Sequence, residues 1–263
     1  MAKTVLAMGC HPDDIEFLMA GTLLHLKDRG CDVHYMITAS GDLGSLRYGR
    51  EELARIRREE ARAAAAFLGA HFHDSITGDL QVFYAEPLIS RVAAVVREVR
   101  PDIMLVMSPQ DYMEDHMNTC RIGVTAAFAK GVPNYVTDPP REAYQGDVTL
   151  YHALPHGLRD GLGTEIAADF FIDITAVIDR KQEMLALHKS QQDWLGASQG
   201  MNSYLATMRD MAAEVGSRCG SYQFAEGFRR HSHLGFSAVP MDPLGDILGD
   251  LRCEARKDTG KGR

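Results

Sequence analysis

Short apolar runs alternate with longer amphipathic segments through the first half of the chain. The runs have the length of a β-strand, and in the segments between them apolar residues recur at the spacing of an α-helix. Strands are predicted at residues 4–8, 33–39, 70–73 and 103–107. Strands that alternate with helices form parallel sheets, joined by right-handed crossovers. The pattern therefore predicts an α/β fold with a doubly wound, Rossmann-like parallel sheet and helices on both of its faces.

The helical segments carry their own end signals. Gly30 and Gly69 follow two of them, and glycine commonly ends a helix at that position. Helices are predicted over residues 15–29, 51–68, 87–100, 117–130, 176–188 and 201–215.

The second half of the chain is less regular. Strands are predicted at 148–154 and 169–174, and a loop at 194–200. We expect a single domain over residues 1–250, with a variable C-terminal part, and a polar tail over residues 251–263.

Two clusters of histidine and aspartate directly follow predicted strands. His11-Pro12-Asp13-Asp14 comes after the strand at 4–8, and the segment 111–116, which ends in Asp115-His116, comes after the strand at 103–107. Alone, the first cluster could equally cap the helix that follows it. In the strand order 3-2-1-4-5, however, the first and fourth strands are neighbours, and ligands bind beyond their carboxyl ends. We therefore expect the two clusters to share one crevice.

Two histidines and one carboxylate are ligands typical of a catalytic zinc site, in which water takes the open position. His11, Asp14 and His116 offer this set, and Asp13 is a spare carboxylate beside it. Such a metal lowers the pKa of water towards ~7, and the spare carboxylate can take the proton. The residues alone do not decide which of the two aspartates binds metal. Iron(II) oxygenases use the same ligand types, but the predicted parallel sheet disfavours that class.

Composition and charge limit the class of protein. The chain of 263 residues is 45% apolar and 24% charged, which is ordinary for a globular protein. Its net charge of −8 disfavours nucleic acid as a partner and favours a neutral or cationic small molecule. We find neither an apolar stretch long enough to span a membrane nor a secretory signal. The five cysteines lack paired spacing, so we expect reduced thiols and a cytoplasmic location.

The paired motifs resemble those of the PIG-L, or LmbE-like, family of zinc-dependent N-acetylglucosaminyl deacetylases. The resemblance implies that His11, Asp14 and His116 hold zinc, with iron(II) or another divalent metal as alternatives, and that Asp13 is the general base. It also implies deacetylation of a small amino-sugar-like molecule and assembly into a homo-oligomer. Two other activities stay open: cleavage of a larger amide such as a thiol S-conjugate, and sugar or metabolite binding without catalysis. Further similarity covers most of the chain, in the segments 38–44, 55–59, 181–191 and 224–228 and at Asp79.

One position departs from the family pattern. Many members carry a histidine three residues before the last metal ligand, where it donates a proton, and this chain has Met113 there. His231 and His233 are the candidates to replace it, because some relatives use a C-terminal histidine, in places from a neighbouring subunit. Residues expected to contact the substrate are Arg55, Asp79, Tyr112 and Asp115.

The remaining candidates are weaker. Asp79 also has the sequence context of a turn residue. His152 and His156 lie on the predicted rim of the crevice and could line the pocket. His71 and His73 are expected to have surface or packing roles rather than to bind a second metal.

Overall fold

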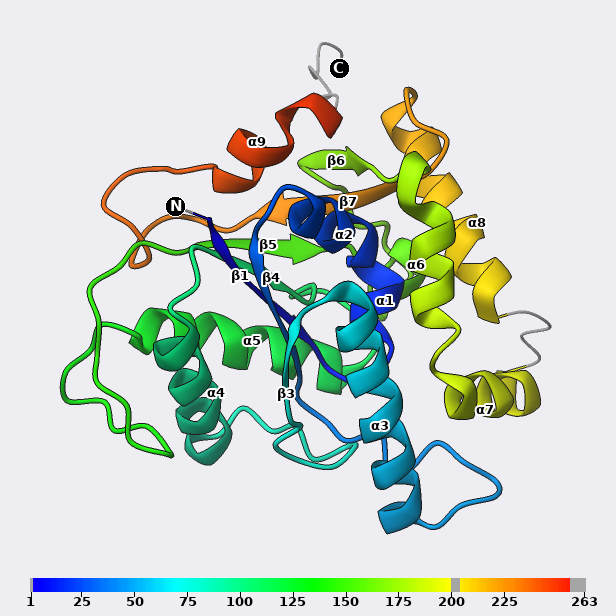
Figure 1. Cartoon of the computed structure of the whole chain (residues 1–263), viewed down its shortest axis with the longest axis horizontal. Coiled ribbons are helices and arrows are strands. Elements are labelled where there is room, and N and C mark those ends of the chain that lie inside the picture. Colours follow the sequence, from blue (N-terminus) through cyan, green and yellow to red (C-terminus); the bar gives the residue numbers. More distant parts are fainter. Residues whose placement is uncertain (1, 200–203, 256–263) are drawn as a thin grey trace.

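The structure is a computed structural model that describes residues 2–199 and 204–255. Its strands form one sheet in the order β3-β2-β1-β4-β5-β7-β6-β8 (Figure 1). The strands are β1 Thr4–Gly9, β2 Asp32–Ile37, β3 His71–His73, β4 Ile103–Val106, β5 Thr149–Ala153, β6 Phe170–Asp173, β7 Ala225–Arg230 and β8 Arg252–Glu254. Strands β3, β2, β1, β4 and β5 are parallel, which confirms the predicted order 3-2-1-4-5. Beyond β5 the sheet continues with antiparallel pairs.

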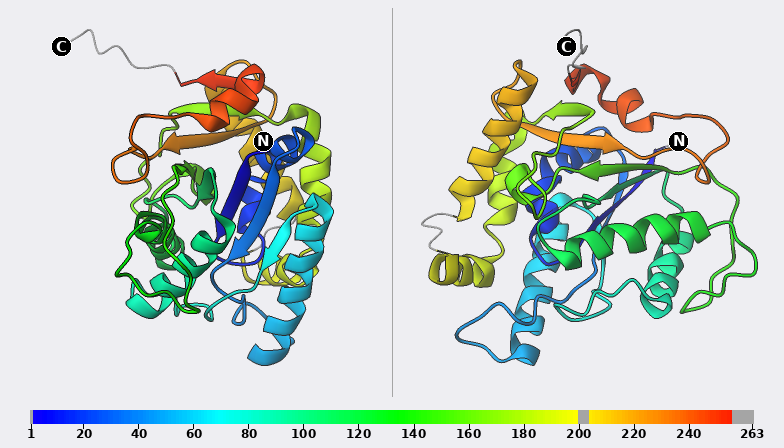
Figure 2. Two further views of the ribbon diagram at one scale, coloured as in Figure 1. Left: turned by 60° about the vertical axis from the view of Figure 1, so that its left-hand side comes forward. Right: turned by 180° about the vertical axis from the view of Figure 1, so that it is seen from behind.

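Helices cover both faces of the sheet, as predicted (Figure 2). On one face α4 packs against α5, and on the other α6 contacts α1, α2, α3 and α8. The helices are α1 Asp14–Leu18, α2 Ala20–Asp28, α3 Arg50–Leu68, α4 Glu86–Val99, α5 Glu114–Ala129, α6 Ile178–Leu185, α7 Lys189–Gln199, α8 Tyr204–Cys219 and α9 Pro243–Leu248. Short 3-10 turns occupy His156–Leu158, Thr175–Val177 and Gly249–Leu251. None of the helices described here combines the length and apolar composition needed to cross a bilayer.

The two central strands form the middle of the core. Val5, Leu6, Ala7 and Met8 of β1 have no exposed surface, and neither do the residues of β4. Helices on both faces bury such strands completely, which explains why they are continuous apolar runs in the sequence. Polar residues begin where these strands end, so the chemistry of the chain gathers at the carboxyl edge of the sheet.

The C-terminal part differs from the sequence prediction. The expected loop at 194–200 belongs mostly to helix α7. The first turn of α7 is fixed by Glu60 of α3, whose carboxylate accepts hydrogen bonds from the Ser190 N–H at 2.9 Å and from the Ser190 hydroxyl at 2.6 Å. Because this anchor comes from a distant helix, the local sequence does not reveal it.

The sequence prediction starts the polar C-terminal tail at residue 251, which is too early. Arg252–Glu254 form β8, which pairs with β6 at the edge of the sheet. Residues 256–263 of that tail lie outside the described residues, as do residues 200–203, which include the start of the helix predicted at 201–215. Among the described residues, helix α8 spans Tyr204–Cys219.

Candidate active site

A cavity of about 280 Å³ opens beyond the carboxyl ends of β1 and β4. The turn after β1 contributes His11, Asp13 and Asp14 to its wall, and the start of α5 contributes His116. The ring centroids of His11 and His116 are 5.4 Å apart. The structure therefore brings together the two clusters that are remote in the sequence.

The turn after β1 folds Asp14 back against the end of its own strand. Asp14 Oδ2 accepts hydrogen bonds from the backbone N–H of Cys10 at 3.0 Å and of His11 at 2.7 Å. Gly9 leaves room for this turn, since a Cβ there would lie 2.9 Å from Ile15 Cγ1. Asp13 has a φ of 114°, a backbone conformation that costs about 1–3 kcal/mol in a residue other than glycine. The fold tolerates this strain and places the Asp13 carboxylate in the cavity wall.

Asp14 lies between the two histidines. Its Oδ2 is 3.7 Å from His11 Nδ1, and its Oδ1 is 3.5 Å from His116 Nε2. The Cys10 sulfur is also near, 3.7 Å from His11 Nε2. A donor atom of Cys10 lies within 4.8 Å of donor atoms of His11 and Asp14, and burial raises the pKa of the Cys10 thiol to about 11. Two imidazoles and one carboxylate are the set typical of a catalytic zinc site, and His11, His116 and Asp14 offer that set here.

Each imidazole is held on its other side by a further carboxylate. His11 Nε2 lies 3.3 Å from Asp115 Oδ2, and His116 Nδ1 lies 3.1 Å from Asp111 Oδ1. Histidines that bind metals usually have such a partner, which fixes the ring and leaves one nitrogen free for the metal. Asp115 also accepts the Leu80 N–H at 2.7 Å. Asp115, which we expected to contact the substrate, is thus placed behind His11 and does not line the cavity.

The carboxylates around the imidazoles of His11 and His116 favour the binding of a cation between them. Burial lowers the pKa of His116, but Asp14 and Asp111 outweigh burial and raise it above its ordinary value. Burial likewise raises the pKa of Asp14, yet the two histidines and the backbone N–H of His11 hold it well below its usual range. A field that stabilises protonated imidazoles also stabilises a divalent ion. The donor set and its surroundings therefore fit a metal such as zinc.

The Asp13 carboxylate is bound by side chains that do not belong to the donor set. The Tyr204 hydroxyl donates a short hydrogen bond to Asp13 Oδ2, and Arg57 Nη2 lies 3.8 Å from Asp13 Oδ1. Burial, opposed by the Arg57 charge, raises the pKa of Asp13 to about 6. A carboxylate whose pKa is close to neutral is suited to take up and return a proton at physiological pH.

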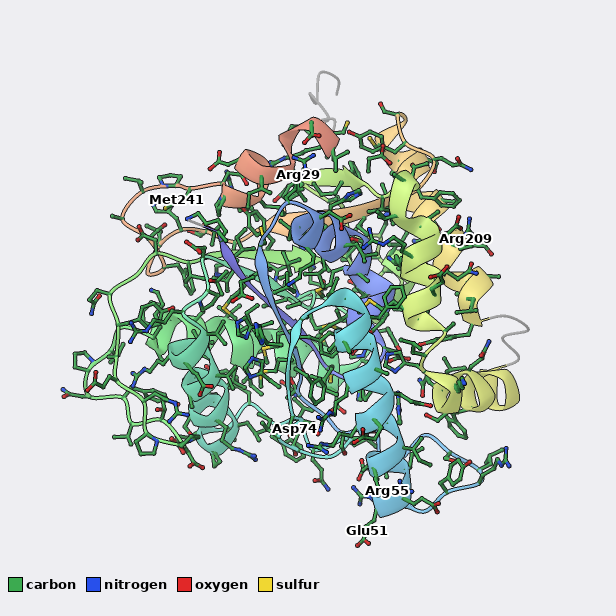
Figure 3. All side chains as sticks on the ribbon, viewed as in Figure 1. Arg29, Glu51, Arg55, Asp74, Arg209 and Met241 are labelled. Carbon is green, nitrogen blue, oxygen red and sulfur yellow. The ribbon has the colours of Figure 1, made fainter. Side chains whose placement is uncertain are left out.

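Arg57 is itself fixed by backbone carbonyls. Its Nη2 donates to Pro12 O at 2.8 Å and its Nη1 to Gly41 O at 3.2 Å. Gly41 has a φ of 74°, and a Cβ there would lie 2.6 Å from Arg57 Nε, so both backbone and space require glycine. Arg57 lines the cavity, whereas Arg55, our sequence candidate for substrate contact, lies on the exposed side of α3 (Figure 3). The prediction identified the right helix, but the structure does not place Arg55 at the site.

Asp79 lines the cavity and also anchors a loop. Its Oδ1 accepts the Gly41 N–H at 2.7 Å and its Oδ2 accepts the Leu43 N–H at 3.2 Å. The same Oδ1 is 3.9 Å from His11 Nε2. Both oxygens are therefore engaged in shaping the loop after β2, which agrees with the turn role that the sequence also suggested.

The mouth of the cavity is aromatic and apolar. Tyr112 is 53% exposed there, with its ring edge-on to His116 at a centroid distance of 5.5 Å. Trp194 of α7 packs so close to the loop after β2 that a Cβ on Gly44 would lie 3.0 Å from Trp194 Cδ1. Leu43 and Leu80, both exposed, complete this rim. An acidic floor thus lies beneath an apolar rim.

The structure places one of the rim histidines in the cavity and the C-terminal pair elsewhere. His156 lines the cavity, with its ring edge-on to Phe17 at 4.8 Å, and burial lowers its pKa. His231 and His233 line a different pocket beside the amino end of β5, where the His231 N–H donates to Leu150 O. Within one chain, neither can replace the histidine missing at Met113.

Three residues at the site were missed from the sequence. Tyr204 contacts Asp13 from a helix about 190 residues away, and nothing in its local sequence marks it. Trp194 lies in a segment that we expected to be a loop. Arg57 could have been found, because it falls on the buried face of α3, where an arginine needs partners.

Comparisons with known proteins identify several proteins that this chain is similar to. Residues 6–127 match the PIG-L family model, described as GlcNAc-PI de-N-acetylase. The chain is 29% identical to a diacetylchitobiose deacetylase of Thermococcus kodakarensis, over 72% of this chain and 70% of that protein. It is 28% identical to a 4-oxalmesaconate hydratase of Pseudomonas putida, over 72% of this chain and 74% of that protein. Among solved structures, the 4-carboxy-2-hydroxymuconate hydratase of Pseudomonas putida shares the fold, with a TM-score of 0.74, 23% identity, and coverage of 91% of this chain and 99% of that one.

Proposed function

We propose that this chain, whose residues 6–127 match the PIG-L family model, is a metal-dependent hydrolase that removes an N-acetyl or similar acyl group from an amino-sugar-like small molecule. The observation that carries the proposal is the placement of Asp13 beside, but outside, the group formed by His11, Asp14 and His116. Amide hydrolysis by metal-activated water needs both a donor set and a separate proton acceptor.

His11, Asp14 and His116 would hold the metal, which we propose to be zinc, with iron(II) or another divalent ion as alternatives. When bound, such an ion polarises the amide carbonyl and lowers the pKa of water. Asp13 takes the proton from the attacking water, since its carboxylate is free of the donor set and has a pKa near neutral. The Tyr204 hydroxyl and the Arg57 guanidinium hold that carboxylate in place.

Two steps remain for residues of the cavity: stabilising the developing negative charge and protonating the leaving amine. Asp13 can return its proton to the amine, because it becomes a neutral acid after the first transfer. His156 is the third imidazole of the cavity wall, and a neutral imidazole still donates one N–H. We therefore propose His156 as a donor to the oxyanion, in place of the histidine that Met113 replaces.

The charge of the cavity favours a neutral substrate. Asp13, Asp14 and Asp79 line it, and Arg57 is the only lysine or arginine among its described lining residues. The aromatic and apolar rim, with Tyr112 and Trp194, provides flat surfaces of the kind that pack against the faces of sugar rings. A neutral N-acylated amino sugar fits these properties.

Hydration of an unsaturated polycarboxylate is the second candidate, because a hydratase matches as much of the chain as a deacetylase does. A polycarboxylate needs cationic partners in its site. The Arg57 guanidinium already donates to the carbonyls of Pro12 and Gly41, and three aspartates face the same space. Even with a divalent ion bound, these three aspartates offset its charge together with that of Arg57, so the charge balance of the cavity ranks this activity below deacetylation.

The decisive experiment compares substrates on zinc-loaded protein and on variants. We expect release of acetate from N-acetylglucosamine or N,N′-diacetylchitobiose, and no hydration of an unsaturated polycarboxylate. Asp13→Asn should keep its zinc and lose turnover by at least ~10²-fold, because the proton acceptor is gone. His116→Ala and Asp14→Ala should lose the metal itself.

Other outcomes select the other hypotheses. Faster cleavage of a thiol S-conjugate amide would indicate the larger-amide hydrolase, and sugar binding without hydrolysis would indicate a binding protein. Loss of zinc in Asp13→Asn with retention in Asp14→Asn would reverse the roles of the two aspartates. The cysteines lack the paired spacing of a disulfide framework, and we propose a cytoplasmic location on that ground.

A further inference from the structure

A second group of histidines lies at the opposite end of the sheet from the cavity. Asp32 is the first residue of β2 and His71 the first residue of β3, which is the edge strand. The cavity opens beyond the carboxyl ends of the parallel strands, so the two places are separated by the length of the strands (Figure 2). None of this group lines the cavity.

The strand register places these side chains on one face. His34 of β2 is paired with His71 of β3 in the parallel ladder, and Met36 with His73. Side chains two residues apart on a strand point to the same face. Asp32 therefore lies on the same side of the sheet as His34, and His73 on the same side as His71. Three imidazoles and one carboxylate gather on a two-strand ribbon.

The distances within this group are those of a ligand set. His71 Nε2 lies 3.1 Å from Asp32 Oδ1, and His34 Nε2 lies 3.6 Å from Asp32 Oδ2. One donor atom from each of these residues lies within 4.8 Å of those of the other two. The rings of His34 and His71 are adjacent, with centroids 4.7 Å apart.

The fourth member fixes the orientation of His34. His34 Nδ1 and His73 Nε2 are 2.9 Å apart, so one of the two nitrogens donates a proton to the other. With its Nδ1 engaged in this bond, His34 turns its Nε2 towards Asp32. A metal-binding histidine is commonly held in this way through its second nitrogen.

We infer that Asp32, His34 and His71 form a second binding site for a transition-metal dication such as Zn²⁺, with His73 as the residue that positions His34. Two imidazoles and one carboxylate suit zinc, nickel, copper or iron(II), whereas Mg²⁺ and Ca²⁺ prefer oxygen ligands throughout. The side chains of His71 and Asp32 are 65% and 47% exposed, so an ion can enter and water can complete its coordination. This assignment does not depend on the proposed function.

Such an ion would join the edge strand to the body of the sheet. Strand β3 is only three residues long and pairs with β2 alone. Ligands from both strands would crosslink them, and an ion that binds the folded chain better than the unfolded chain raises its stability by mass action. Without an ion, three adjacent imidazoles repel one another once they become protonated.

The test measures zinc per chain after the full chain has been stripped with a chelator, reloaded with Zn²⁺ and passed over a desalting column. Asp32→Asn and His71→Gln should each bind one equivalent less than the unmodified chain. Asp74→Asn is the matched control, since it removes a carboxylate that directly follows the edge strand, has its hydrogen bonds with Arg58 and is not one of the proposed ligands. His73→Ala should retain the site with zinc affinity weakened by about tenfold.

A thermal melt provides the second readout. Zinc added to the stripped chain should raise the melting temperature by a smaller amount in Asp32→Asn than in Asp74→Asn. Equal zinc content in the unmodified chain, Asp32→Asn and His71→Gln would overturn the inference. His116→Ala distinguishes the two sites. If the cavity does not bind metal, this variant should hold as much zinc as the unmodified chain. Asp32→Asn and His71→Gln should still each hold one equivalent less.

Discussion

In the cavity, side chains of the same type have different surroundings and therefore different proposed roles. His11 and His116 both face Asp14 and both have a carboxylate behind them, whereas His156 has aromatic neighbours, Phe17 and Tyr112. All three are histidines, so it is their surroundings that assign His11 and His116 as the proposed metal ligands and His156 as the proposed hydrogen-bond donor. A sequence shows the identities alone, which is why His156 could be only a weak candidate before the fold was known.

Substitution of His156 tests its proposed role. His156→Ala should lower kcat for deacetylation by about 10²–10³-fold, because one donor to the oxyanion is lost. His156→Gln keeps an N–H donor and should recover part of that loss. Zinc content should be unchanged in both variants. Steady-state kinetics and metal analysis measure these effects, and an unaltered kcat in His156→Ala would remove His156 from the mechanism.

His152 predicts a pH dependence of stability. It is buried between Met107 O at 3.0 Å and His231 Nδ1 at 2.9 Å. Burial lowers the pKa of His152 to about 4. The unfolded chain has an ordinary histidine pKa of about 6.5 and binds a proton in this range, so folding stability is complete above pH ~6.5 and falls as pH decreases towards 4.

Between pH 7.5 and 5 this one group should remove about 2 kcal/mol from the free energy of unfolding. Urea denaturation of His152→Gln should therefore show a smaller difference between these two pH values than the unmodified chain. His233→Gln, which replaces a histidine outside this hydrogen-bonded pair, is the control. Identical acid sensitivity in all three proteins would show that His152 does not titrate in this way.

At the scale of elements, a buried ion pair connects three parts of the fold. Lys181 of α6 donates to Glu226 of β7 at 2.6 Å, and the Glu226 carboxylate also accepts the N–H groups of Gly21 and Thr22 in the first turn of α2. Lys181 and Glu226 are almost completely buried. Every donor around Glu226 would lose its acceptor if this carboxylate were removed.

Glu226→Ala should therefore destabilise the chain by about 3–5 kcal/mol, the usual cost of leaving a buried partner unpaired. Asp28→Ala is the matched control, because Asp28 pairs at 2.7 Å with Arg180, the neighbour of Lys181, and both side chains of this pair are half-exposed. That substitution should cost no more than about 1 kcal/mol. Urea unfolding measures both, and equal costs would mean that burial of the pair does not matter.

Elements differ in how far their sequences predict them. The parallel strands could be predicted with their order, because near-complete burial makes β1 and β4 continuous apolar runs, and short crossovers leave few arrangements for the others. The ligand groups at the ends of β1 and β4 followed from that order. Helix α7 and strand β8 could not be predicted in this way: α7 depends on its bond to Glu60, and β8 is only three residues long. The partners that determine both are distant in the chain.

At the scale of the whole molecule, the expected homo-oligomer remains a prediction. Size-exclusion chromatography with light scattering should give a multiple of the mass of one chain. His156 completes the cavity from within the same chain, so His233→Ala should change kcat by less than about threefold. A loss of 10²-fold with zinc retained would instead show that a neighbouring subunit supplies His233 to the site.

The wall of the cavity is assembled from two separate stretches of chain. The donor set and Asp13 lie within residues 6–127, the stretch that the family model covers, whereas His156, Gln191, Trp194 and Tyr204 all come later. A lineage can therefore inherit the metal ligands with the first stretch and acquire a new substrate through the second, provided that the second keeps His156 and Tyr204 for the proposed reaction. Chimeras joined between α5 and β5 that keep these two residues are a practical way to retarget this scaffold.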